Sequence, residues 1–238
     1  MKYVINVIRL ICIVISAGIS STLGIIVLLF TFSTDRCINT AVTLFSTSVF
    51  FICGVKLITK GGEGLTKTPG KIYVSNHESH LDPPAITLAC PHTLYFIAKK
   101  ELKYVPFIGW YIWLSGMIFI DRKNRTKAQQ SIQQAADKVR NGKNVISFPE
   151  GTRTKTGELM VFRRGAFKMA KLNDLEIVPI AIKGSREVLA SGSMFITPGV
   201  ISVNIGEVIS PEEYKDLSVE QLANYARERV KALREEIE

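Results

Sequence analysis

Residues 71–84, KIYVSNHESHLDPP, combine a strand pattern, a polar loop and a helix start within a short distance. The first five favour a strand, whereas Asp82 followed by Pro83 and Pro84 is typical of a capped helix start. Between them, residues 76–82 hold two of the three histidines in the chain. A polar loop that leaves a strand and opens a helix is where α/β sheets place their chemistry. This stretch therefore predicts an α/β fold with a functional site at one end of the strand.

The rest of the chain alternates in the same manner. Apolar, β-rich runs are separated by amphipathic segments that follow a helical period. This alternation predicts an α/β fold with a mixed, largely parallel sheet flanked by helices. Further strands are expected at 94–98, 117–121, 144–148, 176–182 and 200–205, and helices at 126–141, 163–172 and 219–237.

The N-terminal region is strongly apolar. Residues 11–32 carry no charge, and a second apolar stretch follows at 37–55. A helix over the first stretch would cover about 33 Å, enough for a membrane anchor. Lys2 and Arg9 could begin a signal peptide, but the length of the first run and the presence of a second favour an uncleaved anchor.

These features predict three regions. Residues 1–58 are expected to form a two-helix membrane hairpin, 59–70 a glycine- and lysine-rich linker, and 71–238 the catalytic domain. The pattern does not decide whether the hairpin crosses the bilayer or lies in one leaflet. The net charge of +9, with basic residues beside the apolar runs, favours anionic headgroups and the cytoplasmic face. No nucleic-acid motif accompanies this charge, and the four cysteines show no paired spacing.

The polar cluster at 76–82 has several chemical interpretations. His77, His80 and Asp82 could bind a metal, but their spacing differs from HExxH and the cluster lies in a loop. No G-x-S-x-G motif supplies a covalent nucleophile. Asp82 could simply cap the helix, although that leaves His77 unexplained. In the remaining interpretation His77 is a general base oriented by Asp82, and the hydroxyl of a substrate is the nucleophile.

The cluster also resembles a family motif. NHESHLD at 76–82 is similar to the NHxxxxD motif of the glycerolipid acyltransferases, and GMIFIDR (116–122), FPEGTR (148–153) and VPIAI (178–182) follow in the order of that family. AKKEL (98–102) and FRRGAF (162–167) are also similar to it. These blocks extend over about half of the chain. They resemble most the 1-acylglycerol-3-phosphate acyltransferases, which form phosphatidic acid.

The resemblance implies roles for particular residues. His77 and Asp82 would be catalytic, and no metal or cofactor would be needed. A guanidinium suits the phosphate of a lysophosphatidate, because it can bind two oxygens at once. Residues expected to bind the glycerol phosphate are Arg122, Glu150, Gly151, Arg153 and Lys99.

The resemblance implies partners and a location as well. The acyl donor would be acyl-carrier protein or acyl-CoA, and the enzyme would act on the cytoplasmic face of the cell inner membrane or plasma membrane. Two other functions remain open. The chain could acylate a different lysolipid, or it could be a membrane-attached metal-dependent hydrolase that uses His77, His80 and Asp82 as ligands.

Overall fold

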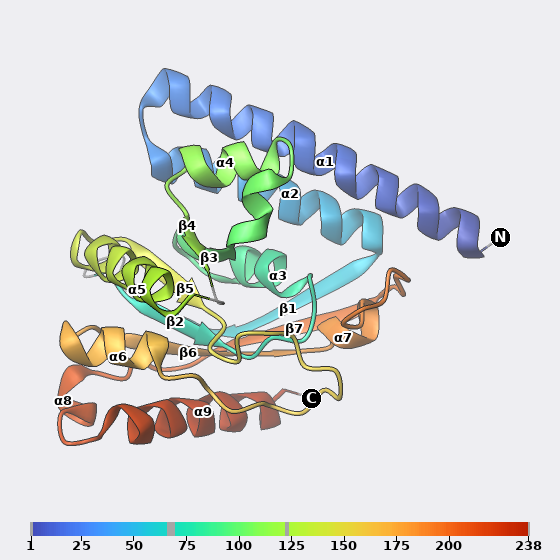
Figure 1. Ribbon diagram of the computed structural model, residues 1–238. Helices are drawn as coiled ribbons and strands as arrows, with labels where there is room; N and C mark the ends of the chain where they lie inside the picture. The colour runs from blue at the N-terminus through green and yellow to red at the C-terminus, as the bar shows by residue number, and fades with distance from the viewer. Residues whose placement is uncertain (1, 66–69, 122–123, 238) are drawn as a thin grey trace.

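The computed structural model describes residues 2–65, 70–121 and 124–237, and it has helices on both faces of one sheet (Figure 1). The helices are α1 (Lys2–Thr31), α2 (Thr34–Cys53), α3 (Asp82–Ala89), η1 (Lys100–Tyr104), α4 (Ile108–Leu114), α5 (Arg125–Arg140), α6 (Gly165–Leu172), α7 (Ser185–Val188), α8 (Pro211–Tyr214) and α9 (Val219–Glu235). The strands are β1 (Val55–Gly61), β2 (Ile72–Ser75), β3 (Leu94–Lys99), β4 (Ile118–Ile120), β5 (Asn144–Ser147), β6 (Ile177–Lys183) and β7 (Gly199–Ile205).

The strands form one sheet in the order β1-β7-β6-β2-β5-β3-β4. Neighbouring strands are parallel except for β6 and β7, which are antiparallel. The predicted α/β fold with a mixed, largely parallel sheet is therefore confirmed. Strand β2 lies between β5 and β6, and the three run in the same direction. The loops that leave their carboxyl ends consequently meet at one edge of the sheet.

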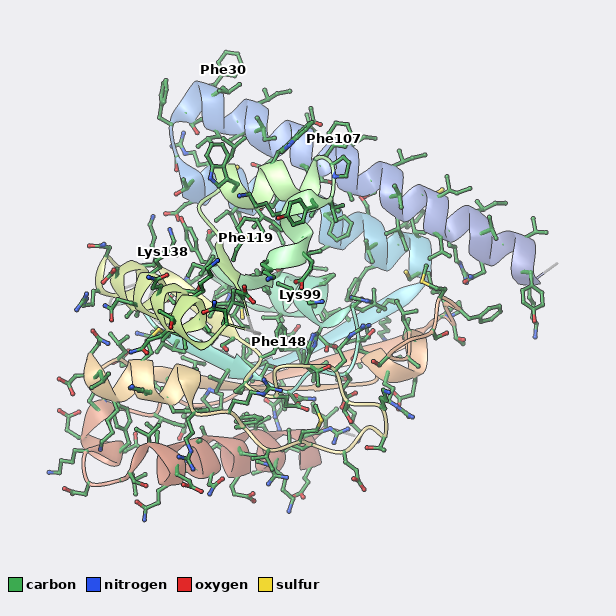
Figure 2. The ribbon with its side chains drawn as sticks, viewed as in Figure 1. Phe30, Lys99, Phe107, Phe119, Lys138 and Phe148 are labelled. Atoms are coloured by element: carbon green, nitrogen blue, oxygen red, sulfur yellow. The ribbon has the colours of Figure 1, made fainter. Side chains whose placement is uncertain are left out.

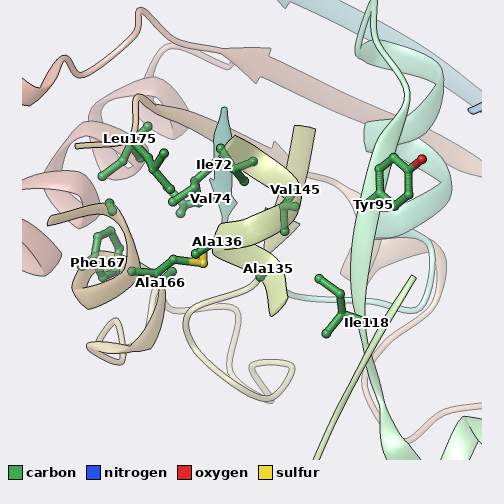
Figure 3. Close-up of a cluster of buried hydrophobic side chains, with 14 of the residues drawn as sticks. Ile72, Val74, Tyr95, Ile118, Ala135, Ala136, Val145, Ala166, Phe167 and Leu175 are labelled. Atoms are coloured by element: carbon green, nitrogen blue, oxygen red, sulfur yellow. The ribbon is translucent and has the colours of Figure 1, made fainter. Parts of the chain in front are cut away.

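Alternate side chains of the central strands face two separate hydrophobic cores. Ile72 and Val74 of β2 pack with residues of α5, α6 and α9, whereas Tyr73 packs with residues of α2 and α3. Figure 3 shows the first of these cores, with strand side chains facing Ala135 and Ala136 of α5. Every residue of β2 is buried, as expected for a parallel strand covered by helices on both faces.

The two N-terminal helices pack against each other and run in opposite directions (Figure 1). The chain reverses at Phe32, which has a positive φ of 51°, and the side chain of Ser33 then caps α2. At the helix contact, a Cβ added to Gly24 would lie 2.7 Å from that of Ala41, so a glycine is required there. Both helices are long and apolar enough to cross a membrane.

The boundary expected at residue 58 falls inside a strand. Residues 55–61 form β1, which pairs along its whole length with β7 at one edge of the sheet. Residues 55–58 were expected to end the anchor, and the lysines and glycines from residue 59 onward to begin a linker. The lysine side chains are tolerated because most of β1 is exposed. We therefore propose that the catalytic unit begins at Val55.

The helical hairpin also makes specific polar contacts with the rest of the protein. Asn6 of α1 is buried, and its amide donates to the carbonyl of Met194 at 2.8 Å while accepting from the N–H of Ile196 at 2.8 Å. At the start of α2, the carboxylate of Asp35 accepts hydrogen bonds from Tyr95 and Lys143, each at 2.7 Å. The hairpin is thus attached to the α/β unit near both of its ends.

Candidate active site

The side chain of Asn76 fixes the chain where it leaves β2. Its amide nitrogen donates to the carbonyl of Ile182 at 2.9 Å, and its amide oxygen accepts from the N–H of the same residue at 2.8 Å. This pair of bonds imitates one further step of the ladder between β2 and β6. The next residue, His77, therefore starts from a well-defined position at the carboxyl edge of the sheet.

His77 and Asp82 form a hydrogen-bonded pair. The Nδ1 atom of His77 lies 2.7 Å from Oδ2 of Asp82, whose side chain is completely buried. The same oxygen accepts from the backbone N–H groups of Glu78 at 2.6 Å and Ser79 at 2.8 Å. These donors stabilise the charged carboxylate. A carboxylate in this position holds the proton of the imidazole on Nδ1 and leaves Nε2 as the basic nitrogen.

One interpretation of the sequence expected Asp82 to cap α3, but in the structure it does not. It is the first residue of that helix, and the preceding Leu81 occupies the capping position without a side-chain hydrogen bond. Pro83 and Pro84 follow it in the first turn, where missing N–H groups are harmless. The carboxylate is consequently free to turn back toward the loop and the imidazole.

The ring of His77 is held on one face by Phe148. The two rings stack with centroids 4.1 Å apart and an interplanar angle of 20°. The side chain of His77 is 17% exposed, and Nε2 has no hydrogen bond within the described part of the chain. The imidazole is thus fixed in orientation while part of it remains open to a substrate.

Glu150 holds the loop of His77 through a hydrogen bond to its backbone. Its side chain is buried, with Oε1 accepting from the backbone N–H of His77 at 2.8 Å and Oε2 accepting from that of Met160 at 3.4 Å. Burial raises the pKa of Glu150 to about 7. In the structure this side chain contacts the backbone of two loops, and its expected contact with the glycerol phosphate stays a prediction.

Gly151 and Arg153 belong to the turn that follows Glu150. Gly151 has a φ of +74°, and a Cβ there would lie 2.7 Å from the guanidinium of Arg163, so only glycine fits without rearrangement. Arg153 is partly exposed and has no hydrogen bond or ion pair within the described residues. Its charge acts on the neighbouring His80, whose pKa is lowered by burial and then by Arg153 and His77.

Lys99 is the last residue of β3 and is exposed, with Glu101 at 3.7 Å. Because Phe96 pairs with Ile146, the end of β3 lies level with Phe148 at the end of β5. Figure 2 shows Lys99 and Phe148 in the same central region of the molecule. The other predicted phosphate ligand, Arg122, lies outside the described residues and follows the end of β4.

The arrangement required for a metal site is not seen in the described ranges. No three of the described His, Cys, Asp and Glu side chains converge as metal ligands. Asp82, the carboxylate that the hydrolase hypothesis assigned to a metal, is directed at His77 and two backbone N–H groups. The geometry therefore favours the pairing of a base with its orienting carboxylate.

One further charged side chain of this loop, Glu78, lies between His77 and Asp82 in the sequence. It is buried, and its Oε1 accepts from Arg234 of α9 at 2.6 Å and from Asn76 at 3.2 Å. Burial raises its pKa to about 7, although Arg234 acts in the opposite direction. The sequence does place Arg234 on the same stripe of α9 as the buried residues Leu222, Ala226 and Val230.

Comparison with known proteins identifies the family. Residues 56–183 match the protein family described as Acyltransferase. The chain belongs to this family. The resemblance inferred from the ordered motifs is thereby confirmed, and the match contains the segments that carry His77, Asp82, Glu150 and Arg153.

Individual relatives agree with this assignment. A 1-acyl-sn-glycerol-3-phosphate acyltransferase of Saccharomyces cerevisiae is 33% identical over 180 residues, which cover 74% of this chain and 59% of the relative. One of Borreliella burgdorferi is 26% identical over 182 residues, covering 76% of this chain and 72% of the relative. The chain thus spans under two thirds of the length of the yeast relative.

A solved structure is similar over nearly the whole chain. The crystal structure of the 1-acyl-sn-glycerophosphate (LPA) acyltransferase PlsC from Thermotoga maritima matches with a TM-score of 0.83 and 27% sequence identity. The match covers 98% of this chain and 95% of that one. It therefore includes the N-terminal helices as well as the α/β unit.

Proposed function

We propose that this protein transfers a fatty acyl group to the sn-2 hydroxyl of 1-acylglycerol-3-phosphate and so forms phosphatidic acid. The donor is acyl-carrier protein or acyl-CoA. The observation that carries the proposal is the 2.7 Å contact between His77 and Asp82 at the carboxyl edge of the sheet. The yeast and Borreliella relatives and the Thermotoga protein are all named as acyltransferases of 1-acylglycerol phosphate, which supports the choice of acceptor.

The proposed reaction needs no nucleophile from the protein. Nε2 of His77 removes the proton of the acceptor hydroxyl as its oxygen attacks the thioester carbonyl. Collapse of the tetrahedral adduct breaks the carbon–sulfur bond, and the imidazolium returns its proton to the leaving thiolate. Asp82 stabilises the imidazolium and keeps the ring in the productive tautomer.

Binding of the acceptor phosphate is assigned to Arg153, with Arg122 and Lys99 as further candidates. Arg153 follows the Gly151 turn and has no ion-pair partner among the described residues, so its guanidinium is available to an anion. Lys99 ends a neighbouring strand, β3. Glu150 and Gly151 are assigned to the support of this turn, because one carboxylate binds backbone groups and the other residue permits the bend.

Membrane attachment is assigned to the N-terminal hairpin together with the adjacent α4 region. Large apolar side chains are exposed on both, and Figures 1 and 2 show α1 and α4 on the same side of the molecule. An exposed apolar surface of this extent is typical of a membrane contact. It includes Val14, Leu29, Phe30, Phe32, Phe51, Tyr104, Phe107, Trp110 and Trp113. We place it on the cytoplasmic face of the inner or plasma membrane, where a water-soluble donor can reach the site.

The test is an assay of the purified full chain in mixed micelles. Labelled lysophosphatidate is supplied with acyl-CoA or acyl-carrier protein, with and without a strong chelator. We expect phosphatidate acylated at sn-2 with at least one donor, at a rate that the chelator does not change. Equal rates with lysophosphatidylcholine would point to a different acceptor. Lipid hydrolysis that the chelator abolishes would replace the proposal with the metal-dependent hydrolase.

A further inference from the structure

Two arginines of the C-terminal helix α9 reach the loop that follows β5. Arg227 and Arg234 are seven residues apart (234 − 227), or about two helical turns, and so project from the same face. The guanidinium of Arg227 donates to the carbonyls of Leu159 at 2.8 Å and Met160 at 3.0 Å. Figure 1 shows this long loop crossing from the sheet to the C-terminal half of α9.

Arg234 connects the same loop to the motif beside β2. Its Nη2 donates to the carbonyl of Gly157 at 2.8 Å and to Oε1 of Glu78 at 2.6 Å. The carboxylate of Glu78 is 2% exposed, and the arginine side chain is 26% exposed. Removing one partner from such a pair leaves a buried group without its counter-ion. Because the contact is costly to break, Arg234 holds the loop of Glu78 and the loop of Gly157 together.

Glu78 in turn contacts the groups on each side of His77. Its Oε1 accepts from the amide of Asn76, which is itself bound to β6, and its backbone N–H donates to Asp82. A displacement of Glu78 would consequently move both the start of the catalytic loop and the carboxylate that orients the imidazole.

We propose that Arg234 is a positioning residue for acyl transfer. Through Glu78 it fixes the loop that carries His77, and through Gly157 it fixes the loop that carries Arg153, so that the base and the phosphate ligand keep one relative position. Arg234 touches no reacting atom. The inference rests on the proposed function, since it concerns the same two loops.

The test compares Arg234→Met and Arg234→Lys with Arg229→Met. Arg229 is a matched control on the same helix, because its partner Glu207 is 3.6 Å away and 92% exposed. Each purified full-length variant is assayed well below its own melting temperature, with kcat and the acceptor KM measured at saturating donor. We expect Arg234→Met to lower kcat about 10–100-fold, because small displacements of a catalytic group have effects of this size. Arg234→Lys should recover most of that loss, and Arg229→Met should stay within about twofold of the wild type.

A purely structural role predicts a different result. It would lower the melting temperature of Arg234→Met and leave kcat per folded molecule unchanged, and that outcome overturns the inference. If Arg234→Met does not fold, Arg234→Gln decides, because its shorter neutral side chain cannot hold both Glu78 and Gly157: a measurable fall in kcat supports the inference, and a wild-type kcat overturns it. Combining Glu78→Gln with Arg234→Gln should cost little more than the worse single change, because both act on one contact; additive losses would contradict the path through Glu78.

Failure of the inference can be told apart from failure of the proposed function. His77→Ala is assayed alongside. If it is inactive while Arg234→Met keeps the wild-type kcat, only the role of Arg234 is wrong. If His77→Ala retains activity, the proposed mechanism is wrong whatever Arg234 does.

Discussion

Glu150 accepts a hydrogen bond from the backbone N–H of His77 at 2.8 Å, although 73 residues separate the two in sequence. The bond connects the loop after β5 to the loop after β2. The same carboxylate also accepts from the N–H of Met160. One buried side chain thus holds the backbone of His77, the turn of Arg153 and the end of the long loop in a common arrangement.

The first prediction concerns the pH dependence of stability. Burial raises the pKa of Glu150 from 4.5 to about 7. A carboxyl with a raised pKa stabilises the folded state fully below the unfolded pKa, and that contribution is lost as the pH rises through about 7. The wild type should therefore lose up to about 3 kcal/mol from this group between pH 4.5 and 7. Glu150→Gln should make the melting temperature depend less on pH across this window.

The control for this experiment is Glu158→Gln, because Glu158 is exposed on the same loop. Its melting temperatures should follow those of the wild type at every pH. Glu78 contributes in the same direction as Glu150, since burial raises its pKa to about 7 as well, so Glu150→Gln should remove only part of the slope. Parallel curves for Glu150→Gln and the wild type would show that the carboxyl does not titrate as proposed.

The second prediction concerns the orienting carboxylate. Asp82→Asn keeps an oxygen for the N–H groups of Glu78 and Ser79 but removes the charge that stabilises the imidazolium. We expect kcat to fall by about 10²–10⁴-fold with little change in the acceptor KM. Initial rates at saturating donor measure this, with Asp137→Asn as the control, because the side chain of Asp137 is 49% exposed and lies on α5. A variant whose acceptor KM rises while kcat is retained would assign Asp82 to binding instead.

Much of this arrangement could be predicted from the sequence, and the reasons are local. The strands that became β2, β5 and β6 are short, apolar and bounded by turn residues, so their pattern identifies them. His77 and Asp82 are close in sequence, and a turn is enough to bring them together. The alternation of strands and helices also predicts that the loops after β2 and β5 meet at one edge of the sheet.

The parts that were not predicted depend on distant segments. The edge strand β1 was missed because its partner β7 lies far away in sequence and its own sequence mixes apolar residues with lysines and runs into a glycine-rich segment. The hydrogen bond from the backbone N–H of His77 to Glu150 was not predicted, because only the folded chain brings these two residues together. The buried partners of Glu78 were missed for the same reason, although an arginine on the buried stripe of α9 was an available signal.

The third prediction tests the phosphate site. Arg153→Ala should lower kcat/KM for lysophosphatidate about 10–100-fold, because a charge-assisted hydrogen bond contributes roughly 1.5–3 kcal/mol. Lysine at this position should restore only part of the loss. We expect the same of Arg122→Ala. Initial rates against acceptor concentration measure both effects, with Arg164→Ala as the control, since Arg164 pairs with Glu220 on the surface.

The donor KM of the same arginine variants is the internal control for the third prediction. The donor KM should stay within about threefold for Arg153→Ala and Arg122→Ala, since neither residue is assigned to the thioester. The use of lysophosphatidylcholine should also fall less than that of lysophosphatidate. If the donor KM rises and the acceptor KM is retained, the two substrates have been assigned to the wrong sides of the site.

The fourth prediction concerns the membrane surface. Deleting residues 1–58 would remove the first half of β1 and the buried residues of α2, so it would damage the fold as well as the anchor. Substitutions on the exposed face separate these effects. Phe30 is 83% and Trp113 67% exposed. Phe30→Glu combined with Trp113→Glu should reduce cosedimentation with anionic vesicles at high salt at least about tenfold, because two large apolar groups leave the membrane.

The control for the membrane experiment is Leu172→Glu. Leu172 is 70% exposed at the end of α6, away from the hairpin, and its substitution should leave vesicle binding unchanged. High salt removes contributions from the basic residues of the surface. Equal loss of binding in both variants, or in neither, would mean that the hairpin and α4 do not form the membrane contact.

The most direct measurement compares kcat for His77→Ala and His80→Ala with that of the wild type, using lysophosphatidate and the better donor. Both residues lie on one loop, but only His77 is paired with Asp82. We predict that His77→Ala loses at least about 10²–10⁴-fold in kcat, while His80→Ala stays within about tenfold and both keep the melting temperature of the wild type to within a few degrees. Substantial activity in a correctly folded His77→Ala, or an equal loss in both variants, would contradict the assignment of His77 as the general base.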